Sequence, residues 1–178
     1  MSTGEIHRFP PHPPQGGITL VETMTTLAVA SILLTAAIPP MQDFVIRTRM
    51  SVEVNNFVAS LYLARSEAVK RLQDVSLCPT TNGASCDTST DFDWSKGWMV
   101  YADRDNSNTF SNGDVVLQRN AKMPFKNDAG HTKFITFNPR GSSNAGSFTF
   151  SDDDGIAETR CVTGSPDGRS YVSSGACS

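Results

Sequence analysis

Histidine is scarce in this 178-residue chain, and the motifs that mark common catalytic sites are missing. Of three histidines only His131 lies beyond residue 17, and there is no Gly-x-Ser-x-Gly, no His-Glu-x-x-His and no Gly-rich phosphate loop. The four cysteines form no Cys-x-x-Cys pair, and no histidine lies near enough to them for a zinc knuckle. A carboxylate pair among the many aspartates stays open, although nothing in the sequence places two of them together. These absences argue against an enzyme, and the sequence predicts no cofactor and no metal.

The chain also has no overall excess of positive charge. Its 15 Lys and Arg face 18 Asp and Glu, a formal net charge of −3. The charge is segregated, however: residues 119–140 carry five basic residues against Asp128 and sum to +4, whereas residues 87–114 sum to −4. The five basic residues are Arg119, Lys122, Lys126, Lys133 and Arg140. Such segregation permits an anionic partner, DNA included.

One long apolar run is present, from Ile18 to Ile38. Its twenty-one residues are apolar or small, with Thr and Ser as the neutral polar types and Glu22 as the single charge. As a helix the run would be about 31 Å long, which matches the hydrocarbon layer of a bilayer. A carboxylate there costs about 2 to 3 kcal/mol or more, so Glu22 should have a partner. Cleavage after Gly17 would supply one, the new α-amino group of Ile18, either in the same helix or in a neighbouring one.

Two simpler interpretations compete with a spanning helix that serves in assembly. A plain signal peptide has an apolar core of about 7 to 15 residues, and Ala28-Val29-Ala30 could be its cleavage site. Against it, the run continues to Ile38 and contains Glu22. An ordinary membrane anchor explains the length, but it explains neither the Gly16-Gly17 pair nor Glu22.

The segments on either side of the run differ in kind. Residues 1–17 contain four prolines close together, which prevent a helix, and are interpreted as a processing segment. Pro39 and Pro40 should kink or locally open the helix. From there to Leu72 apolar residues recur at three- and four-residue spacing, which is typical of an amphipathic helix. They are Val54, Phe57, Val58, Leu61, Ala64, Ala68 and Leu72, with Ser60 among the polar residues between them.

Residues 73–178 are rich in Gly, Ser, Thr, Asn and Asp and contain short β-prone runs. Seven strands are predicted, at residues 75–78, 97–102, 114–119, 133–138, 146–151, 158–163 and 169–173. About a hundred residues can bury a core of their own, completed by the apolar face of the helix. The predicted fold class is therefore α+β: a long kinked N-terminal helix, formed by residues 18–38 and 39–72, packed on an antiparallel β-domain at 73–178. The two tryptophans are expected in the core and its turns.

The four cysteines, Cys78, Cys86, Cys161 and Cys177, allow three pairings. A domain outside the cytoplasm would oxidise them. The two local bridges, Cys78 with Cys86 and Cys161 with Cys177, are favoured. In the loop-entropy model they stabilise the fold by about 2.6 and 3.1 kcal/mol.

One acidic loop, residues 103–114, offers oxygen ligands at alternate positions, as a calcium loop does. Asn108 replaces the glycine of the sharp turn, and Asp114 replaces the bidentate glutamate at the end. These departures favour a solvated hairpin loop over a calcium site.

The N-terminal motif carries a resemblance to a known family. Gly17 followed by Ile-Thr-Leu-Val-Glu, with an apolar helix interrupted at Pro39, resembles the class III signal and first helix of type IV pilins and type II secretion pseudopilins. The resemblance implies that a membrane prepilin peptidase cuts after Gly17 and methylates Ile18. It also implies that subunits polymerise through these helices, with Glu22 neutralising the amino group of an adjacent subunit. Two features depart from the family: Ile18 stands where Phe is usual, and the leader is long and Pro-rich.

Further motifs resemble the GspH/FimT branch of minor subunits. They are the stretch from Leu63 to Arg71, which reads LARSEAVKR, then Trp94, Gly97-Trp98, and the residues from Phe137 to Gly141. The resemblance implies a structural subunit at or near the tip of a type II secretion pseudopilus or type IV pilus, priming its assembly. Its partners would be other pilins, the prepilin peptidase and the inner membrane, with the C-terminal domain in the periplasm.

A second function implied by the resemblance is DNA binding during uptake. Some FimT-type subunits bind DNA through a C-terminal Gly-Arg-x-Arg motif, which would fall at Gly168 and Arg169 here. Tyr171 stands in place of the second arginine, so half of the cationic pair is missing. An aromatic residue there could instead stack on a base.

Overall fold

The computed structural model describes residues 17–107, 109–128 and 132–177, and for residues 36–40 it describes the backbone but not the side chains. Residues 1–16 of the predicted processing segment 1–17, and His131, lie outside the described residues. The chain divides into two compact units, Met1–Met41 and Gln42–Ser178. Each unit is considered by itself below.

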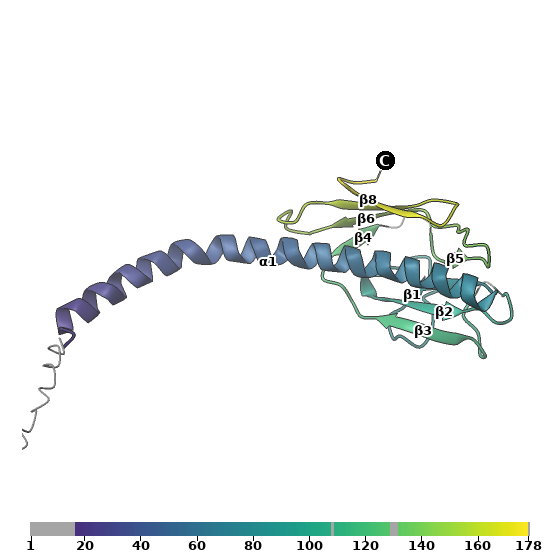
Figure 1. Ribbon diagram of the computed structural model, residues 1–178, viewed down its shortest axis with the longest axis horizontal. Coiled ribbons are helices and arrows are strands. Elements are labelled where there is room, and N and C mark those ends of the chain that lie inside the picture. The colour runs from purple at the N-terminus through teal and green to yellow at the C-terminus, as the bar shows by residue number, and fades with distance from the viewer. Residues whose placement is uncertain (1–16, 108, 129–131, 178) are drawn as a thin grey trace, which may run out of the picture. The chain divides into compact units, whose positions relative to one another are not determined.

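Helix α1, Leu20–Arg71, contributes to both units (Figure 1). Its helical backbone continues through Pro39 and Pro40, and the predicted kink there stays a prediction. It ends at Arg71, because Leu72 adopts a positive φ of 53°. The expectation that Leu72 lies on the buried face is therefore wrong: it is 77% exposed.

Among the residues whose side chains are described, no helix is long and apolar enough to cross a membrane. The last part of the predicted span, residues 36–38, lies outside that set.

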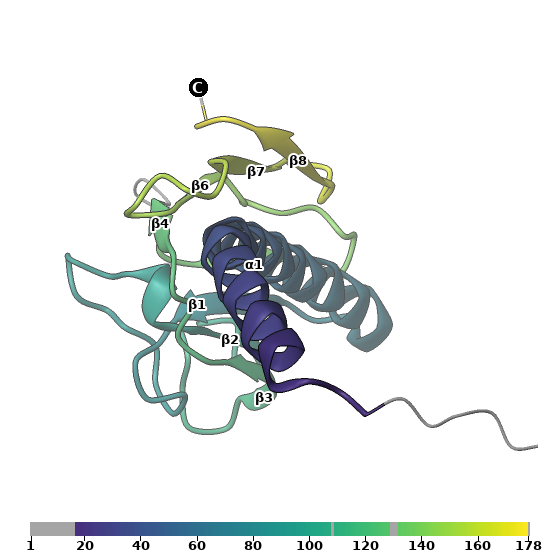
Figure 2. The same cartoon turned by 90° about the vertical axis from the view of Figure 1, so that its left-hand side faces the viewer.

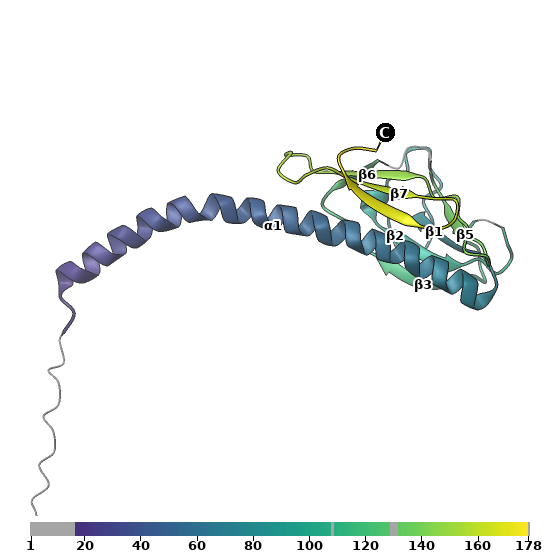
Figure 3. The ribbon, with the colours of Figure 1, turned by 45° about the horizontal axis from the view of Figure 1, so that its top comes forward.

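The second unit contains two four-stranded sheets with antiparallel pairing throughout. The first has the strand order β3-β2-β1-β5 and the second β4-β6-β7-β8. In the first, β1 is Val75–Pro79, β2 is Trp98–Ala102, β3 is Val115–Asn120 and β5 is Ile135–Phe137. In the second, β4 is Lys126–Asp128, β6 is Ser147–Ser151, β7 is Arg160–Gly164 and β8 is Ser170–Ser174. Strand β8, the yellow strand near the C-terminus in Figure 3, forms one edge of the second sheet, and β4 forms the other.

All seven strands predicted from the sequence are present, with ends that differ by one or two residues. Strand β4 was not predicted, because Lys-Asn-Asp has little β propensity and becomes a strand only by pairing with β6. A short 3-10 helix, η1, Trp94–Lys96, was not predicted either. The α+β fold class is confirmed.

The C-terminal half of α1 lies between the two sheets (Figure 2). Its buried face consists of Met50, Val54, Phe57, Leu61, Ala64 and Ala68, each at most 2% exposed. Phe57 is at the centre of this core. Its ring contacts Trp94 of η1, Trp98 of β2 in the first sheet, and Phe148 and Phe150 of β6 in the second sheet, with ring centroids 5.0–5.6 Å apart.

Ser60 is a polar residue on this buried face, and the expectation that it belongs to the polar side is wrong. Its side chain is fully buried and accepts hydrogen bonds from the Trp98 indole N–H (3.0 Å) and the Asn120 amide (3.3 Å). Its own hydroxyl donates to the Asn56 carbonyl oxygen. The hydrogen bonds explain how a polar side chain can be buried there.

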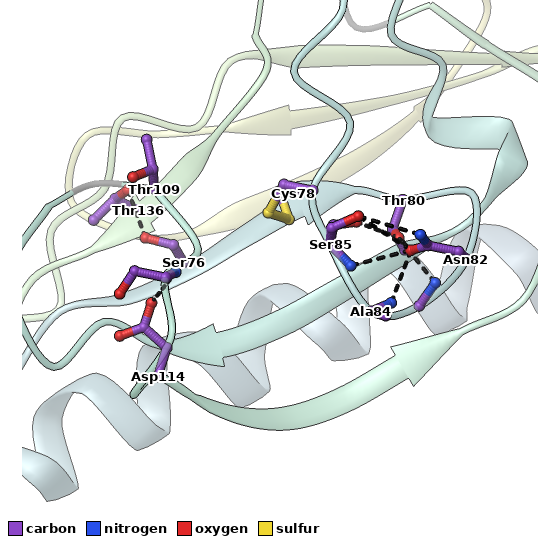
Figure 4. Close-up of a disulfide and its surroundings, with 12 residues drawn as sticks. Ser76, Cys78, Thr80, Asn82, Ala84, Ser85, Thr109, Asp114 and Thr136 are labelled. Carbon is purple, nitrogen blue, oxygen red and sulfur yellow. Dashed lines mark hydrogen bonds between the residues drawn. A yellow bond between two sulfur atoms is a disulfide. The ribbon is translucent and has the colours of Figure 1, made fainter.

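The structure forms both local disulfides, with Cα atoms 5.6 Å apart in Cys78–Cys86 and 5.1 Å apart in Cys161–Cys177. The first closes a tight loop in which the Asn82 side chain accepts hydrogen bonds from the backbone N–H groups of Ala84 and Ser85 (Figure 4). The second ties the C-terminal residues to β7. Both therefore restrain segments with few core contacts of their own.

Candidate assembly site

The first unit presents an apolar surface that nothing in the described chain covers. From Ile18 to Leu34 the large apolar side chains are 57–76% exposed. They are Ile18, Leu20, Val21, Met24, Leu27, Val29, Ile32, Leu33 and Leu34. A contiguous apolar surface of this kind marks a contact with protein or lipid.

The polar residues in this segment do not interrupt its apolar character. The hydroxyls of Thr23, Thr25, Thr26, Ser31 and Thr35 each donate to a backbone carbonyl three residues earlier, at 2.8–3.0 Å. Their hydrogen-bonding capacity is thus largely used within the helix. Small residues of this type also allow neighbouring helices to approach closely.

Glu22 is the one charge in this surface, and it lies in the first turn of α1. Its backbone N–H donates to Thr19 Oγ1 at 3.2 Å, so Thr19 caps the helix. Thr-x-x-Glu at a helix start is the pattern of a capping box, which marks a helix N-terminus in the sequence itself. The cap accounts for the helix start, and the negative charge of Glu22 near the N-terminus interacts favourably with the helix dipole.

The proposed cleavage point lies just before this cap. Residues 17–19 precede the helix, and an added Cβ at Gly17 would meet no atom within 4 Å. The Gly17–Ile18 bond is therefore in open, non-helical backbone. The pairing of Glu22 with an α-amino group stays a prediction, because Ile18 is still joined to Gly17 in this chain.

Gly168 and Arg169, the residues considered for DNA binding, differ in their surroundings. Gly168 has φ of +77°, and a Cβ there would lie 1.9 Å from the Gly141 carbonyl oxygen. Packing alone thus explains a glycine at this position. Arg169 has a 66% exposed side chain whose Nε lies 3.0 Å from an Asp167 carboxylate oxygen.

The basic residues between 119 and 140 do not form one free patch, because three of them hold separate loops. Arg119 donates to the Gly83 carbonyl oxygen at 2.6 Å, and Lys126 pairs with Asp153. Lys133 donates to the Thr88 carbonyl oxygen at 2.9 Å and lies over the Phe92 ring. The positive charge predicted from the sequence is therefore partly used to hold the fold together.

Glu67 of α1 interacts with two basic residues of the same helix. Glu67 lies 2.7 Å from Arg71 Nε and 3.2 Å from Lys70 Nζ. Hydrogen bonds from Arg71 and Lys70 lower the pKa of Glu67. The interaction is within one helix and serves its stability.

Comparison with known families and structures gives two matches to family models. Residues 53–168 match the family described as type II transport protein GspH, and residues 13–38 match the prokaryotic N-terminal methylation motif. No curated protein matches the chain.

Two solved structures are similar, both crystal structures of the type IV minor pilin FimU from Pseudomonas aeruginosa strain PAO1. The form in space group P21 has a TM-score of 0.54 at 18% identity, covering 73% of this chain and 92% of that one. The form in space group P65 has a TM-score of 0.48 at 20% identity, covering 67% and 88%. The first likeness confirms the fold, a long N-terminal helix followed by antiparallel sheets.

Proposed function

The chain belongs to the type II transport protein GspH family, and from this premise we propose that it is a minor subunit of a type II secretion pseudopilus or a type IV pilus. The observation that carries the proposal is the exposed apolar surface of residues 18–35 with Glu22 as its single charge. In a filament, the helices of neighbouring subunits would bury this surface.

The proposal includes processing before assembly. The match of residues 13–38 to the N-terminal methylation motif supports cleavage after Gly17 and methylation of Ile18. The open backbone at this bond also supports it, since a peptidase needs an extended segment. Cleavage creates the amino group that Glu22 of a neighbouring subunit would neutralise.

We extend the proposal to localisation. Before assembly, the segment 18–38 would lie in the inner membrane as a single pass, with the β-domain in the periplasm. The two disulfides of the β-domain support an oxidising compartment. From the resemblance to minor subunits, its place would be at or near the filament tip, where it primes assembly.

The experiment compares Glu22→Ala with Asp43→Ala, a control that removes an exposed carboxylate of the same helix outside the apolar run. Both variants are expected to enter the membrane fraction and to be cleaved. Only Glu22→Ala should co-purify poorly with the other filament subunits, because it leaves their N-terminal amino group without a counter-charge. Undiminished co-purification of Glu22→Ala would contradict the role given to Glu22.

DNA binding is a second candidate function, favoured by the exposure of Arg169 and Tyr171, at 66% for the Arg169 side chain and 54% for Tyr171. The nearby Asp167 weighs against it, because it offsets the arginine charge. The test is fluorescence anisotropy with labelled double-stranded DNA at increasing salt. Binding that weakens with salt, and weakens further in Arg169→Ala, would support this function. Binding unaffected by that variant would exclude the site.

A further inference from the structure

The loop between β2 and β3 brings three carboxylates together. Asp103 is fully buried, Asp114 half-buried and Asp105 exposed, and one oxygen from each lies within 4.8 Å of the others. Calcium binds oxygen at about 2.3 to 2.6 Å, so two of its ligand atoms can be up to about 5 Å apart. All three oxygens can therefore contact a single calcium ion.

Backbone groups of the loop hold these carboxylates in place. The Ser107 N–H donates to Asp103 Oδ1 (3.1 Å) and Asp105 Oδ1 (3.0 Å). Asp114 accepts from the N–H groups of Arg104 (2.9 Å) and Ser111 (2.7 Å). A carboxylate oxygen that accepts one hydrogen bond keeps a lone pair for a cation.

A separate observation concerns Tyr101, which precedes Asp103 by two residues at the end of β2 and so projects from the same face of the chain. It is fully buried, and its ring packs edge-on against Phe110 of the loop, with centroids 5.2 Å apart. Its hydroxyl has no hydrogen-bond partner in the described part of the chain. The Tyr101 side chain therefore lies on the face of β2 that carries Asp103 and packs against the loop.

The buried hydroxyl needs a polar partner, because an unpaired buried donor costs free energy. A water molecule in the hydration shell of an ion held by the three carboxylates would provide it. The hydroxyl comes from the strand and not from the acidic loop, so it indicates a ligand independently of the carboxylates.

We propose that the loop at residues 103–114 binds one calcium ion through Asp103, Asp105 and Asp114, with a bound water that accepts a hydrogen bond from Tyr101. The sequence alone favoured a solvated hairpin, because Asn108 and Asp114 depart from a calcium loop. The burial of Asp103 and Tyr101 instead favours a calcium site over a solvated hairpin. Asp114 has a shorter side chain than the bidentate glutamate that ends a calcium loop, so the affinity should be modest, with Kd of about 10⁻⁴ to 10⁻³ M, as in extracellular calcium modules.

The test uses the full chain in detergent, freed of metal with EGTA and titrated with calcium chloride by calorimetry and thermal unfolding. Calcium should bind with one-to-one stoichiometry and raise the unfolding midpoint by several degrees. Asp105→Asn should weaken calcium binding at least tenfold, and this exposed position leaves the buried groups intact. Asp153→Asn, an exposed aspartate of another turn, is the matched control and should bind as the unchanged protein does.

Three results would overturn the proposal: no calcium binding at about 10 mM, which is about ten times the weakest Kd of such modules, equal binding by the unchanged protein and Asp105→Asn, or equal stabilisation by magnesium. Equal stabilisation by magnesium would indicate charge screening by any divalent cation and not a specific calcium site.

Tyr101→Phe separates the bound water from a merely structural role. Without calcium this variant should be at least as stable as the unchanged protein, because it removes an unpaired hydroxyl. With calcium it should bind several-fold more weakly. Calcium affinity unchanged by Tyr101→Phe would contradict the role of the hydroxyl.

Discussion

Phe57 should be the most sensitive core position on the helix, because its ring joins α1 to both sheets. Its side chain is fully buried and contacts four aromatic rings. Phe→Ala substitutions in cores cost about 3 to 5 kcal/mol, from lost transfer free energy and the cavity that remains. Each aromatic pair is worth about 0.5 to 1.5 kcal/mol beyond burial, which places Phe57→Ala in the upper part of that range, about 4 to 5 kcal/mol.

The expected loss is a large share of the stability of an ordinary domain, about 5 to 15 kcal/mol. The assay is guanidinium unfolding of the full chain followed by the fluorescence of Trp94 and Trp98, which lie against the Phe57 ring. Asn56→Ala is the matched control, because it is the exposed neighbour in the same helix and should cost less than about 0.5 kcal/mol. A loss below about 1.5 kcal/mol for Phe57→Ala would refute the reasoning that this ring anchors the helix.

Two further predictions concern the turn before β8 and the surface of α1. Gly168→Ala should lower the free energy of unfolding by more than about 2 kcal/mol, because Gly168 has a positive φ and lies close to the Gly141 oxygen. The control, Arg169→Ala, should change it by less than about 0.5 kcal/mol. Equal effects of the two substitutions in denaturant unfolding would show that the turn is not tightly packed. Glu67→Gln should cost a few tenths of a kcal/mol at pH 7. Because Arg71 lowers the Glu67 pKa below its ordinary 4.5, this contribution is present above that value and is lost as the pH falls below it; a difference between the two proteins that persists at pH 2 would contradict the assignment.

Local patterns account for what could be predicted. The helical spacing from Val54 to Ala68 identified the buried face because residues three or four positions apart lie on the same face of a helix. The error at Leu72 arose because the spacing continues past the residue at which the helix ends. Ser60 was misplaced because its partners, Trp98 and Asn120, are distant in the sequence.

The candidate site was predictable to the same extent. Glu22 stands out in the sequence because a lone charge in an apolar run is costly. Gly168 was considered for DNA binding because it matches the first residue of a Gly-Arg-x-Arg motif. Its packing role was not visible in the sequence, because its close neighbour Gly141 is 27 residues away. The positive φ of Gly168 and its close approach to Gly141 are visible only in the tertiary structure.

The sequence by itself determined the long helix, the strand-rich domain that follows, the apolar run with its single carboxylate and the family to which the chain belongs. Those features depend on the order of neighbouring residues. Tertiary structure alone decided which strands share a sheet, that β4 is a strand, that Asp103 is buried near two other carboxylates, and that the Tyr101 side chain is buried. It also selected, from three possible cysteine pairings, the two local bridges that the sequence favoured. These depend on contacts between distant segments, whose free energies are set by packing and burial and not by local propensity.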